Sequence, residues 1–302
     1  MQSEAIKVSF IVVTWNRLDD VLRNIGYLSK SRLCGFEILV VENGSTDGSA
    51  ERLEALDSIR LIRLDTNVGP AAARNAAVAC ARGEYLVFLD SDALLSKKGA
   101  ARLVERMDRE PTLGIIGCRI VNAYSRRLDQ WIYPFPPSTH EHLDFETYSF
   151  SAAGAIVRAE AIRSVGGFWD DLNIYNEEVD LSIRMIRAGY RILYEPRVAV
   201  FHCVSNQGRL GSDAFWRFQI RNWIWIFYRY YPPVERWRMI SLYVLLYLAK
   251  GVATRRLAAC VTGIVEGLRA VDVISRFRDK LSPREVHLLR TLNRRTTLRL
   301  GR

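Results

Sequence analysis

The sequence predicts an α/β fold, a Rossmann-like, doubly wound mixed sheet that is followed by a mostly helical extension. Three observations predict it. Apolar strand-like runs alternate with helical patterns in the first half of the chain, polar residues follow three of these runs, and the composition changes near residue 213. Of the 302 residues, 49% are hydrophobic and 25% charged, which provides a buried core and excludes disorder of the whole chain.

The first four expected strands are apolar runs rich in β-branched residues. They cover residues 7–14, 36–41, 59–64 and 84–89. Continuous apolar runs of this length are typical of strands buried on both faces of a parallel sheet. Between them, helices are expected at 19–28, 49–56 and 71–81, and Pro70 suits the first turn of the third helix. Strand–helix alternation of this kind predicts right-handed crossovers.

The next region is less regular. Residues 119–149 lack a clear pattern, and the segment from Tyr133 to His142 indicates a long loop; a strand at 153–157 and a short helix at 160–165 follow it. A helix is expected at 177–188 with Gly189 as its C-cap. Two short strands at 191–194 and 198–202 are expected to close this part.

The cysteines and the N-terminus indicate a cytoplasmic protein. Five scattered cysteines without a C-x-x-C pair argue against a disulfide framework or a zinc knuckle, and favour a reducing compartment. The first residues include Glu4 and a short apolar run that alternates with polar residues, which is not the pattern of a signal peptide.

Polar segments follow three strands, at 14–17, 42–47 and 90–92. The carboxyl ends of parallel strands share one edge of the sheet, where ligands of such sheets bind. A bend after the strand can bring the carboxylates of Asp90 and Asp92 to one cation, and oxygen ligands favour Mg²⁺ or Mn²⁺. Taken alone, this common pattern is better explained by two ordinary turn aspartates.

Six segments in order change that interpretation. They are IVVTWNR at 11–17, ILVVENGSTDGS at 38–49, NVGPAAARNAA at 67–77, EYLVFLDSDA at 84–93, AAGAIVRAEAIRSVGGF at 152–168 and YNEEVDLSIRMIRAGYRILYEPRVAVFH at 175–202. The series resembles the family 2 glycosyltransferases, in particular rhamnosyltransferase-like enzymes of bacterial glycan assembly. The resemblance covers about residues 7–202 and implies the GT-A fold and inversion at the anomeric carbon of the sugar.

The resemblance also implies a donor site, at Thr14, Asn16, Arg17, Glu42, Asn67, Arg74 and Asp90. In the family, an Asp usually stands at the position of Glu42 and hydrogen-bonds the nucleobase. The longer Glu42 keeps the carboxylate oxygens that accept hydrogen bonds, and the identity of the nucleobase stays open. Arg74 would meet the base or a phosphate, and the alternative is an exposed charge on a helix.

A metal site and a catalytic base follow from the same resemblance. Asp92, Asp90 and His202 would hold Mg²⁺ or Mn²⁺, although a lone histidine is often structural. Glu178 stands where the family has the general base that takes the proton from the acceptor hydroxyl. Acids also stabilise the first turn of a helix through its dipole, but this explains one acid of Glu177-Glu178-Val179-Asp180 and not three. We interpret Asp180 as structural, paired with Arg184.

The acceptor would meet Gly154, Trp169 and Glu177. Gly154 would let the chain pass close to the sugar or acceptor, and Trp169 would stack on an acceptor ring. An aromatic that covers the core is the alternative for Trp169. It lies in Phe168-Trp169-Asp170, where relatives usually have Phe-Asp-Glu.

From Phe215 on, aromatic and basic residues interleave. Residues 203–302 contain 19 Lys and Arg against 6 Asp and Glu, so the net charge of +10 belongs to this third of the chain. The uncharged run 239–249 is shorter than the roughly 20 residues that span a bilayer. Three interpretations stay open: contact with an anionic membrane surface, a helical subdomain packed on the catalytic domain, and a nucleic-acid-binding surface. The apolar stretch at 257–265 disfavours the third.

We therefore expect a GT-A domain at 1–212, with a nucleotide-binding part at about 1–118 and an acceptor part at about 119–212, and a basic helical extension at 213–302. The expected reaction moves a sugar from a UDP- or dTDP-linked donor to a glycan or lipid-linked acceptor, at the inner face of the cell membrane and without nucleic acid. A nucleotide-sugar-binding protein without turnover is the alternative, because Glu42 and Glu178 are atypical. A dinucleotide oxidoreductase is excluded, because no G-x-G-x-x-G follows the first strand.

Overall fold

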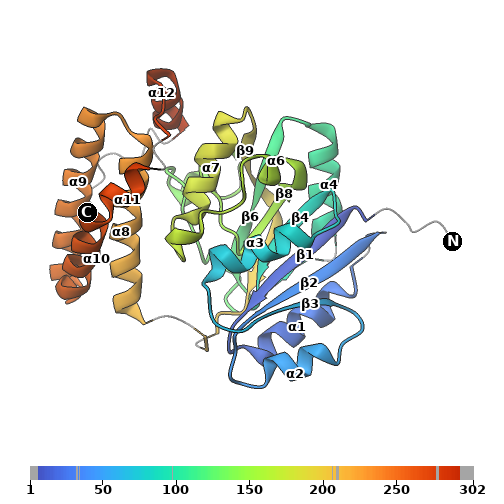
Figure 1. Ribbon diagram of the computed structural model, residues 1–302. Helices are drawn as coiled ribbons and strands as arrows, with labels where there is room; N and C mark the ends of the chain where they lie inside the picture. The colour runs from blue at the N-terminus through green and yellow to red at the C-terminus, as the bar shows by residue number, and fades with distance from the viewer. Residues whose placement is uncertain are drawn as a thin grey trace.

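The computed structural model describes residues 6–31, 33, 35–96, 98–205, 207–208, 211–276 and 279–292. A nine-stranded mixed sheet forms its centre, in the order β3-β2-β1-β4-β8-β6-β9-β5, and β7 pairs with β9 at the side. A separate group of helices, α8 to α12, lies beside the sheet (Figure 1). The expected α/β architecture with a helical C-terminal part is confirmed.

The first four strands are those that the apolar runs predict. They are β1 (Val8–Thr14), β2 (Phe36–Asn43), β3 (Arg60–Leu64) and β4 (Tyr85–Asp90), with α1 (Leu18–Leu28), α2 (Ser49–Glu54) and α3 (Pro70–Cys80) between them. The β1–β2, β1–β4 and β2–β3 pairs are parallel. β2 runs two residues beyond the expected end, because Glu42 and Asn43 still pair with β3.

The second half adds strands that the sequence predicts less well. The elements are β5 (Ala93–Leu95), α4 (Gly99–Arg109), β6 (Leu113–Asn122), α5 (Pro137–His140), β7 (Phe145–Glu146), β8 (Gly154–Arg158), α6 (Ala159–Ser164), the 3₁₀ turn η1 (Asp170–Leu172), α7 (Glu177–Arg187) and β9 (Arg191–His202). β8 lies antiparallel between β4 and β6. The expectation for 119–149 is partly wrong, since the end of β6 and β7 lie in this less regular segment and the short helix α5 interrupts the expected loop.

The two short strands expected at 191–194 and 198–202 are one strand, β9. In the β6–β9 ladder, Cys118 of β6 pairs with Glu195 of β9, but the next residue of β6, Arg119, pairs with Ala199. The extra residues of β9 bulge out of the ladder at Pro196, which has no N–H to donate. The chain therefore stays extended across the proline, and His202 lies at the carboxyl end of β9.

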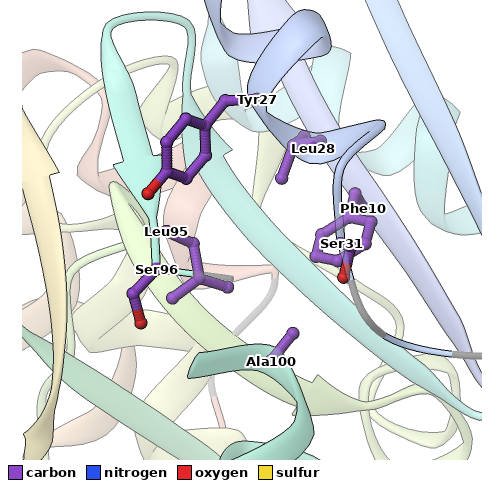
Figure 2. A pocket seen from close by; sticks show the side chains of 7 residues that line it. All are labelled: Phe10, Tyr27, Leu28, Ser31, Leu95, Ser96 and Ala100. Carbon is purple, nitrogen blue, oxygen red and sulfur yellow. The ribbon is translucent and has the colours of Figure 1, made fainter. Parts of the chain in front are cut away.

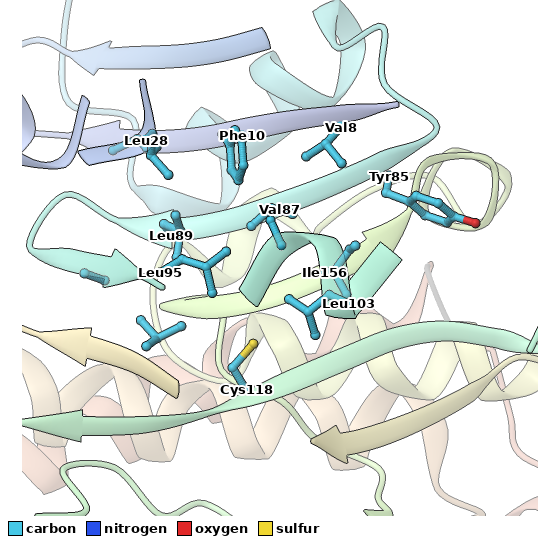
Figure 3. Close-up of a cluster of buried hydrophobic side chains, with 14 of the residues drawn as sticks. Val8, Phe10, Leu28, Tyr85, Val87, Leu89, Leu95, Leu103, Cys118 and Ile156 are labelled. Atoms are coloured by element: carbon cyan, nitrogen blue, oxygen red, sulfur yellow. The ribbon is translucent and has the colours of Figure 1, made fainter. Parts of the chain in front are cut away.

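Two apolar cores form on opposite faces of the sheet, because successive strand residues point to opposite sides. Val8, Phe10 and Val12 of β1 enter one core, in which α1 and α4 cover the sheet. Ile11 enters the other, in which α3, α6 and α7 cover it. Figure 3 shows part of the first core, with Leu28 and Leu103 facing strand residues such as Phe10 and Val87.

The helical extension consists of α8 (Ser212–Tyr230), α9 (Pro233–Ala253), α10 (Leu257–Arg269), α11 (Val271–Ser275) and α12 (Pro283–Leu292). A third core joins Val179 and Ile183 of α7 to Ile220, Ile224 and Tyr230 of α8. The extension is thus packed on the rest of the molecule, as the second of the three interpretations expects. Within the described residues, no helix combines the length and apolarity needed to cross a bilayer.

Glu37 of β2 is a buried carboxylate that ties three segments together. It accepts hydrogen bonds from Ser9 Oγ at 2.6 Å, the Arg82 N–H at 2.7 Å and Arg60 Nη1 at 2.6 Å. Burial disfavours its charged form, but these donors outweigh burial and lower the pKa of Glu37 below its ordinary value of 4.5. Its stabilising contribution is therefore present above pH 4.5 and is lost as the pH falls through the lowered pKa.

We expect Glu37→Gln to lower the free energy of unfolding by about 2 kcal/mol at pH 7, since hydrogen bonds to a charged group are lost. The difference from the unchanged protein should shrink below pH 4.5. Urea unfolding at pH 7 and at acid pH measures both, with the exposed Glu160→Gln as control. A difference that grows toward low pH would contradict the assignment.

Candidate active site

A cleft of about 1280 Å³ opens at the carboxyl ends of β1, β2 and β4. Arg17, Asn43 and Asp92 line its sheet side, Glu177 and Glu178 of α7 its centre, and Trp216 of α8 its far side. Pockets for one small ligand usually hold about 300–1,000 Å³. The cleft thus has room for two ligands side by side.

A second pocket lies between α1 and the β5–α4 segment, away from the cleft (Figure 2). Its volume is about 10 Å³, which is about the space that one water molecule requires. It is lined by Phe10, Tyr27, Leu28, Ser31, Leu95, Ser96 and Ala100. This pocket is too small for a substrate, and the large cleft is the candidate site.

Asp90, Asp92 and His202 meet at the sheet edge, as the sequence predicts. Their ligand atoms lie within 4.8 Å of one another, and the side chains of Asp92 and His202 are buried. His202 Nε2 is 3.2 Å from Asp92 Oδ1, and its Nδ1 is 2.6 Å from Asp129 Oδ2. Carboxylates with one imidazole suit Mg²⁺ or Mn²⁺, and a carboxylate on the far ring nitrogen is the usual support of a histidine ligand.

Charge states in this cluster follow from its contacts. Burial favours neutral His202, but its hydrogen bonds to Asp92 and Asp129 outweigh burial and raise the pKa of His202 to about 9. Burial alone would raise the pKa of Asp92, yet the contacts with His202 and Arg17 lower it to about 2. Asp92 is therefore a carboxylate at neutral pH, which is the form that binds a cation, whereas His202 must lose its proton before it can bind one.

Arg17 brings a positive charge to the same place. Its Nη1 lies 3.0 Å from Asp92 Oδ2, and its Nε donates to the carbonyl of Gln207 at 2.7 Å. Asn16, with a left-handed φ of 52°, ties the ends of β1 and β2 together: Ser45 Oγ accepts its N–H, and its Oδ1 accepts the Thr46 N–H. Arg17 lines the cleft, whereas the buried Thr14 and the partly exposed Asn16 are not among its lining residues.

Glu42 is buried and holds its own loop. Its Oε1 accepts the Ser45 N–H at 2.6 Å, and it does not line the cleft. The next residue, Asn43, does: it donates to Asn67 Oδ1 at 3.0 Å and accepts the Val68 N–H at 3.0 Å. Asn43 and Asn67 thus form the wall beside β2, and contact of Glu42 with a base stays a prediction.

Arg74 of α3 is buried at the floor of the cleft. Its Nη1 is 2.8 Å from Glu177 Oε1 and its Nη2 is 3.6 Å from Asp90 Oδ1. The alternative of an exposed helix charge is therefore wrong. Burial and the charge of Glu178 raise the pKa of Glu177, against the pull of Arg74, to about 8. Arg74 thus lies between Asp90, a member of the expected metal site, and Glu177 of α7.

The acids in the first turn of α7 point in different directions, into the cleft and into the core. Glu178 lines the cleft and is only partly buried, and the Ala152 N–H lies 3.4 Å from its Oε1. Asp180 points away into the core, where it accepts hydrogen bonds from Arg184 Nε at 2.9 Å and Tyr230 Oη at 2.6 Å. The structural interpretation of Asp180 is confirmed, and Glu178 is the α7 acid with open access to the cleft.

Two residues expected at the acceptor lie outside the cleft lining. A Cβ at Gly154 would sit 2.7 Å from Val200 Cγ2, so the glycine leaves room for the side chain of Val200 on β9. Trp169 packs on Trp225, and the Arg229 guanidinium lies 4.5 Å from its ring centre. This contact matches the alternative of a core-covering aromatic, and acceptor binding by either residue stays a prediction.

Asn222 of α8 is a residue that sequence reasoning missed. The segment before α7 holds three left-handed residues other than glycine, Asn173, Tyr175 and Asn176, with φ of 62°, 70° and 65°. Such conformations cost about 1–3 kcal/mol each and need support. The buried Asn222 Nδ2 donates to the carbonyls of Leu172, Ile174 and Tyr175 at 3.0, 2.9 and 2.7 Å. A single asparagine within a helix gives no sequence signal for this role.

The extension also forms one wall of the cleft. Its lining residues are Phe215, Trp216, Phe218, Gln219 and Trp223 of α8, and Tyr247 and Lys250 of α9. Trp216 and Tyr247 meet edge to face, and Tyr247 Oη donates to Gln219 at 3.3 Å. The helical spacing of 216, 219 and 223 is a signal for one shared face. The sequence does not reveal that this face looks into the cleft.

The comparisons with known proteins agree with this geometry. Residues 9–166 match the family model described as glycosyl transferase family 2. The chain belongs to that family. This is the family that the ordered motifs imply.

The chain is 32% identical over 203 residues to the pre-mycofactocin glycosyltransferase of Mycobacterium tuberculosis, a match that covers 61% of this chain and 41% of that relative. The chain thus spans less than half of that relative. Among solved structures, S. aureus TarS 1-349 with UDP-GlcNAc has a TM-score of 0.63 at 16% identity, covering 95% and 88% of the two chains. The mannosyltransferase PcManGT of Pyrobaculum calidifontis, with GDP-Man and Mn²⁺, has a TM-score of 0.57 at 19% identity, covering 96% and 80%. The expected GT-A fold is confirmed.

Proposed function

We propose that this glycosyltransferase inverts configuration as it moves a sugar from a nucleoside-diphosphate sugar to a hydroxyl of a glycan or lipid-linked acceptor. One observation carries the proposal: a single cleft is lined both by the Asp90, Asp92 and His202 cluster and by Glu178. A cation site for a leaving diphosphate and a base for an attacking hydroxyl are the two groups that a single displacement needs.

Donor binding is assigned to the sheet side of the cleft. Asp92, Asp90 and His202 would hold Mg²⁺ or Mn²⁺, which neutralises the negative charge of the diphosphate. Arg17 and Arg74 add fixed positive charges beside this cluster. Asn43 and Asn67 offer amide groups to the nucleoside, which is uridine or thymidine in our proposal. The TarS and PcManGT structures, which contain UDP-GlcNAc and GDP-Man, support a donor of this class.

Acceptor activation is assigned to Glu178. A hydroxyl that lies between Glu178 and the anomeric carbon would lose its proton to this carboxylate as it attacks in line with the leaving diphosphate. Glu177 is held by Arg74 in the floor of the cleft and positions the turn rather than reacting. The aromatic wall from α8 and α9 faces the same space and suits the apolar faces of a sugar ring.

We assign residues 1–212 to the catalytic domain and 213–302 to an extension that completes the cleft. The proposed location is the inner face of the cell membrane, because the extension is basic and aromatic. A nucleotide-sugar-binding protein without turnover is the competing function, and transfer assays separate the two.

Donor and metal binding can be tested by thermal unfolding with UDP-, dTDP- and GDP-linked sugars, with and without Mn²⁺. We expect one nucleotide class to stabilise the protein in a Mn²⁺-dependent way, by about 2.7 kcal/mol at a concentration 100 times the Kd. Asp92→Asn should remove the dependence on Mn²⁺, and the exposed Asp65→Asn should retain it. Equal Mn²⁺ dependence in Asp92→Asn would refute the proposed metal site.

A further inference from the structure

The outer side of the extension exposes two apolar stripes. On α9 the stripe is Val234, Trp237, Leu242, Leu245 and Val252, and on α10 it is Leu257, Val261, Val265 and Leu268. Residues spaced by three, four or seven positions share one face of a helix. Leu245 and Val252 are 67% and 65% exposed, values far above those of a residue that covers a core. We call these nine residues the outer helix face.

The outer helix face is not needed to hold the extension together, because other faces of the helices make those contacts. On α10, Gly263 and Gly267 lie against Arg217, Ile220 and Ile224 of α8. On α9, Gly251 lies against Leu257 and Cys260 at the start of α10. Figure 1 shows α9 and α10 at the edge of the molecule, with α8 between them and the sheet. The exposed stripes therefore have no partner within the described part of the chain.

Positive charge surrounds this apolar surface. Arg238, Arg255, Arg256 and Arg269 are exposed on α9, α10 and the turn between them, and Arg256 pairs with Asp213 of α8 at 3.1 Å. The acids within these two helices are Glu235 and Glu266, and both are paired, Glu235 with Arg238 and Arg290 and Glu266 with Arg217. An apolar surface rimmed by basic residues is the pattern of a helix that lies in the interface of an anionic membrane.

A second copy of the chain would fit the outer helix face less well. A two-fold interface brings the same patch of both subunits together, so the basic residues of one copy would face those of the other. Like charges set against each other in this way cost several kcal/mol. An anionic lipid surface accepts both the apolar side chains and the basic rim.

The position of the cleft also agrees with an anionic lipid surface as the partner of the outer helix face. Lys250 of α9 lines the cleft, next to Tyr247, with its Nζ 5.5 Å from the Tyr247 ring centre. Arg255 and Arg256 follow within two turns of chain, at the junction with α10. The cleft therefore opens beside the basic turn of the extension, where an acceptor carried by a lipid would arrive.

We propose that the outer helix face is a membrane-docking surface, which inserts the α9 and α10 stripes among anionic lipids and holds the cleft at the lipid headgroups. The inference specifies the membrane contact of the proposed function and rests on it for the nature of the acceptor. Docking itself depends on the apolar stripes and the basic rim, and not on turnover.

Sedimentation with phosphatidylcholine vesicles, with and without phosphatidylglycerol, tests the proposal on the full chain. We expect binding to vesicles that contain phosphatidylglycerol, weakened by salt. Leu245→Glu with Val261→Glu should lower the partition coefficient by about tenfold or more, since two apolar side chains no longer insert. The matched control, Tyr124→Glu with Leu143→Glu, adds the same charges at exposed apolar positions of the catalytic part and should bind as the unchanged protein.

Two results would overturn the proposal. One is equal vesicle binding by the α9–α10 double variant, or no binding of the unchanged protein to any vesicle. The other is a dimer that Leu245→Glu with Val261→Glu dissociates in the absence of lipid, which would make a second copy the occupant. Glu178→Gln should bind vesicles normally, so that failure of docking and failure of the proposed catalysis give different results.

Discussion

Glu178→Gln should lower kcat for sugar transfer by about 100- to 10,000-fold, since general bases contribute rate factors of that size. The amide retains the shape of the side chain and its place beside the Ala152 N–H, but it cannot take a proton from the acceptor. The nucleotide side of the cleft is untouched. We therefore expect the KM for the donor, and its Mn²⁺-dependent thermal stabilisation, to stay near those of the unchanged protein.

The matched control for this variant is Glu160→Gln, which changes an exposed acid in the first turn of α6. It should leave transfer unchanged. Near-normal turnover by folded Glu178→Gln would refute its assignment as the base. Loss of transfer together with loss of donor binding would also speak against it, because the substitution would then act through the shape of the cleft.

Asn222→Ala should lower the free energy of unfolding by about 2–4 kcal/mol, because it removes three buried hydrogen bonds to backbone carbonyls. It should also lower kcat. The segment that contains the three left-handed residues before α7 loses this support, and Glu178 stands two residues beyond Asn176. Urea unfolding gives the stability, and steady-state kinetics with a saturating donor give kcat.

The kinetic pattern separates a positioning residue from a general loss of structure. We expect kcat to fall while the KM for the donor stays within about threefold, since the metal cluster lies at the end of β4, in the turn between β4 and β5 and at the end of β9 rather than on this segment. Asp213→Asn on the exposed side of α8 is the control and should change stability by no more than about 0.5 kcal/mol. Equal rises in KM and falls in kcat would contradict the positioning role.

The strands of the first half were predictable because burial on both faces leaves an apolar signature. β1 and β4 are continuous apolar runs of this kind, and Asp90 and Asp92, at the end of β4 and just after it, lie at the expected edge of the sheet. Asp90, Asp92, His202, Arg74 and Glu178 line one cleft, as the ordered motifs imply. β6 carries Gly114 and Gly117, which weaken its strand pattern, and both lie against tyrosine side chains from distant segments.

The parts that escaped prediction depend on contacts between segments far apart in sequence. Asp129 comes from an irregular segment, and only folding brings it to His202 Nδ1, 73 positions away. Glu42 fits the motif, yet its carboxylate turns back to the Ser45 N–H, and the amide of Asn43 takes the place at the cleft wall. Composition revealed the aromatic character of α8, but no local pattern says which surface an aromatic face will meet.

The hydrogen bonds from Asn222 to the segment before α7 have a consequence for the order in which the chain folds during synthesis. Asn222 lies 50, 48 and 47 positions after the three carbonyls that it binds. During synthesis, the sheet and the metal-side residues up to His202 leave the ribosome before α8 does. The nascent chain can thus build its donor pocket while the turn that carries Glu178 is still unsupported. Glu178 would thus gain its support only when α8 docks on the segment before α7.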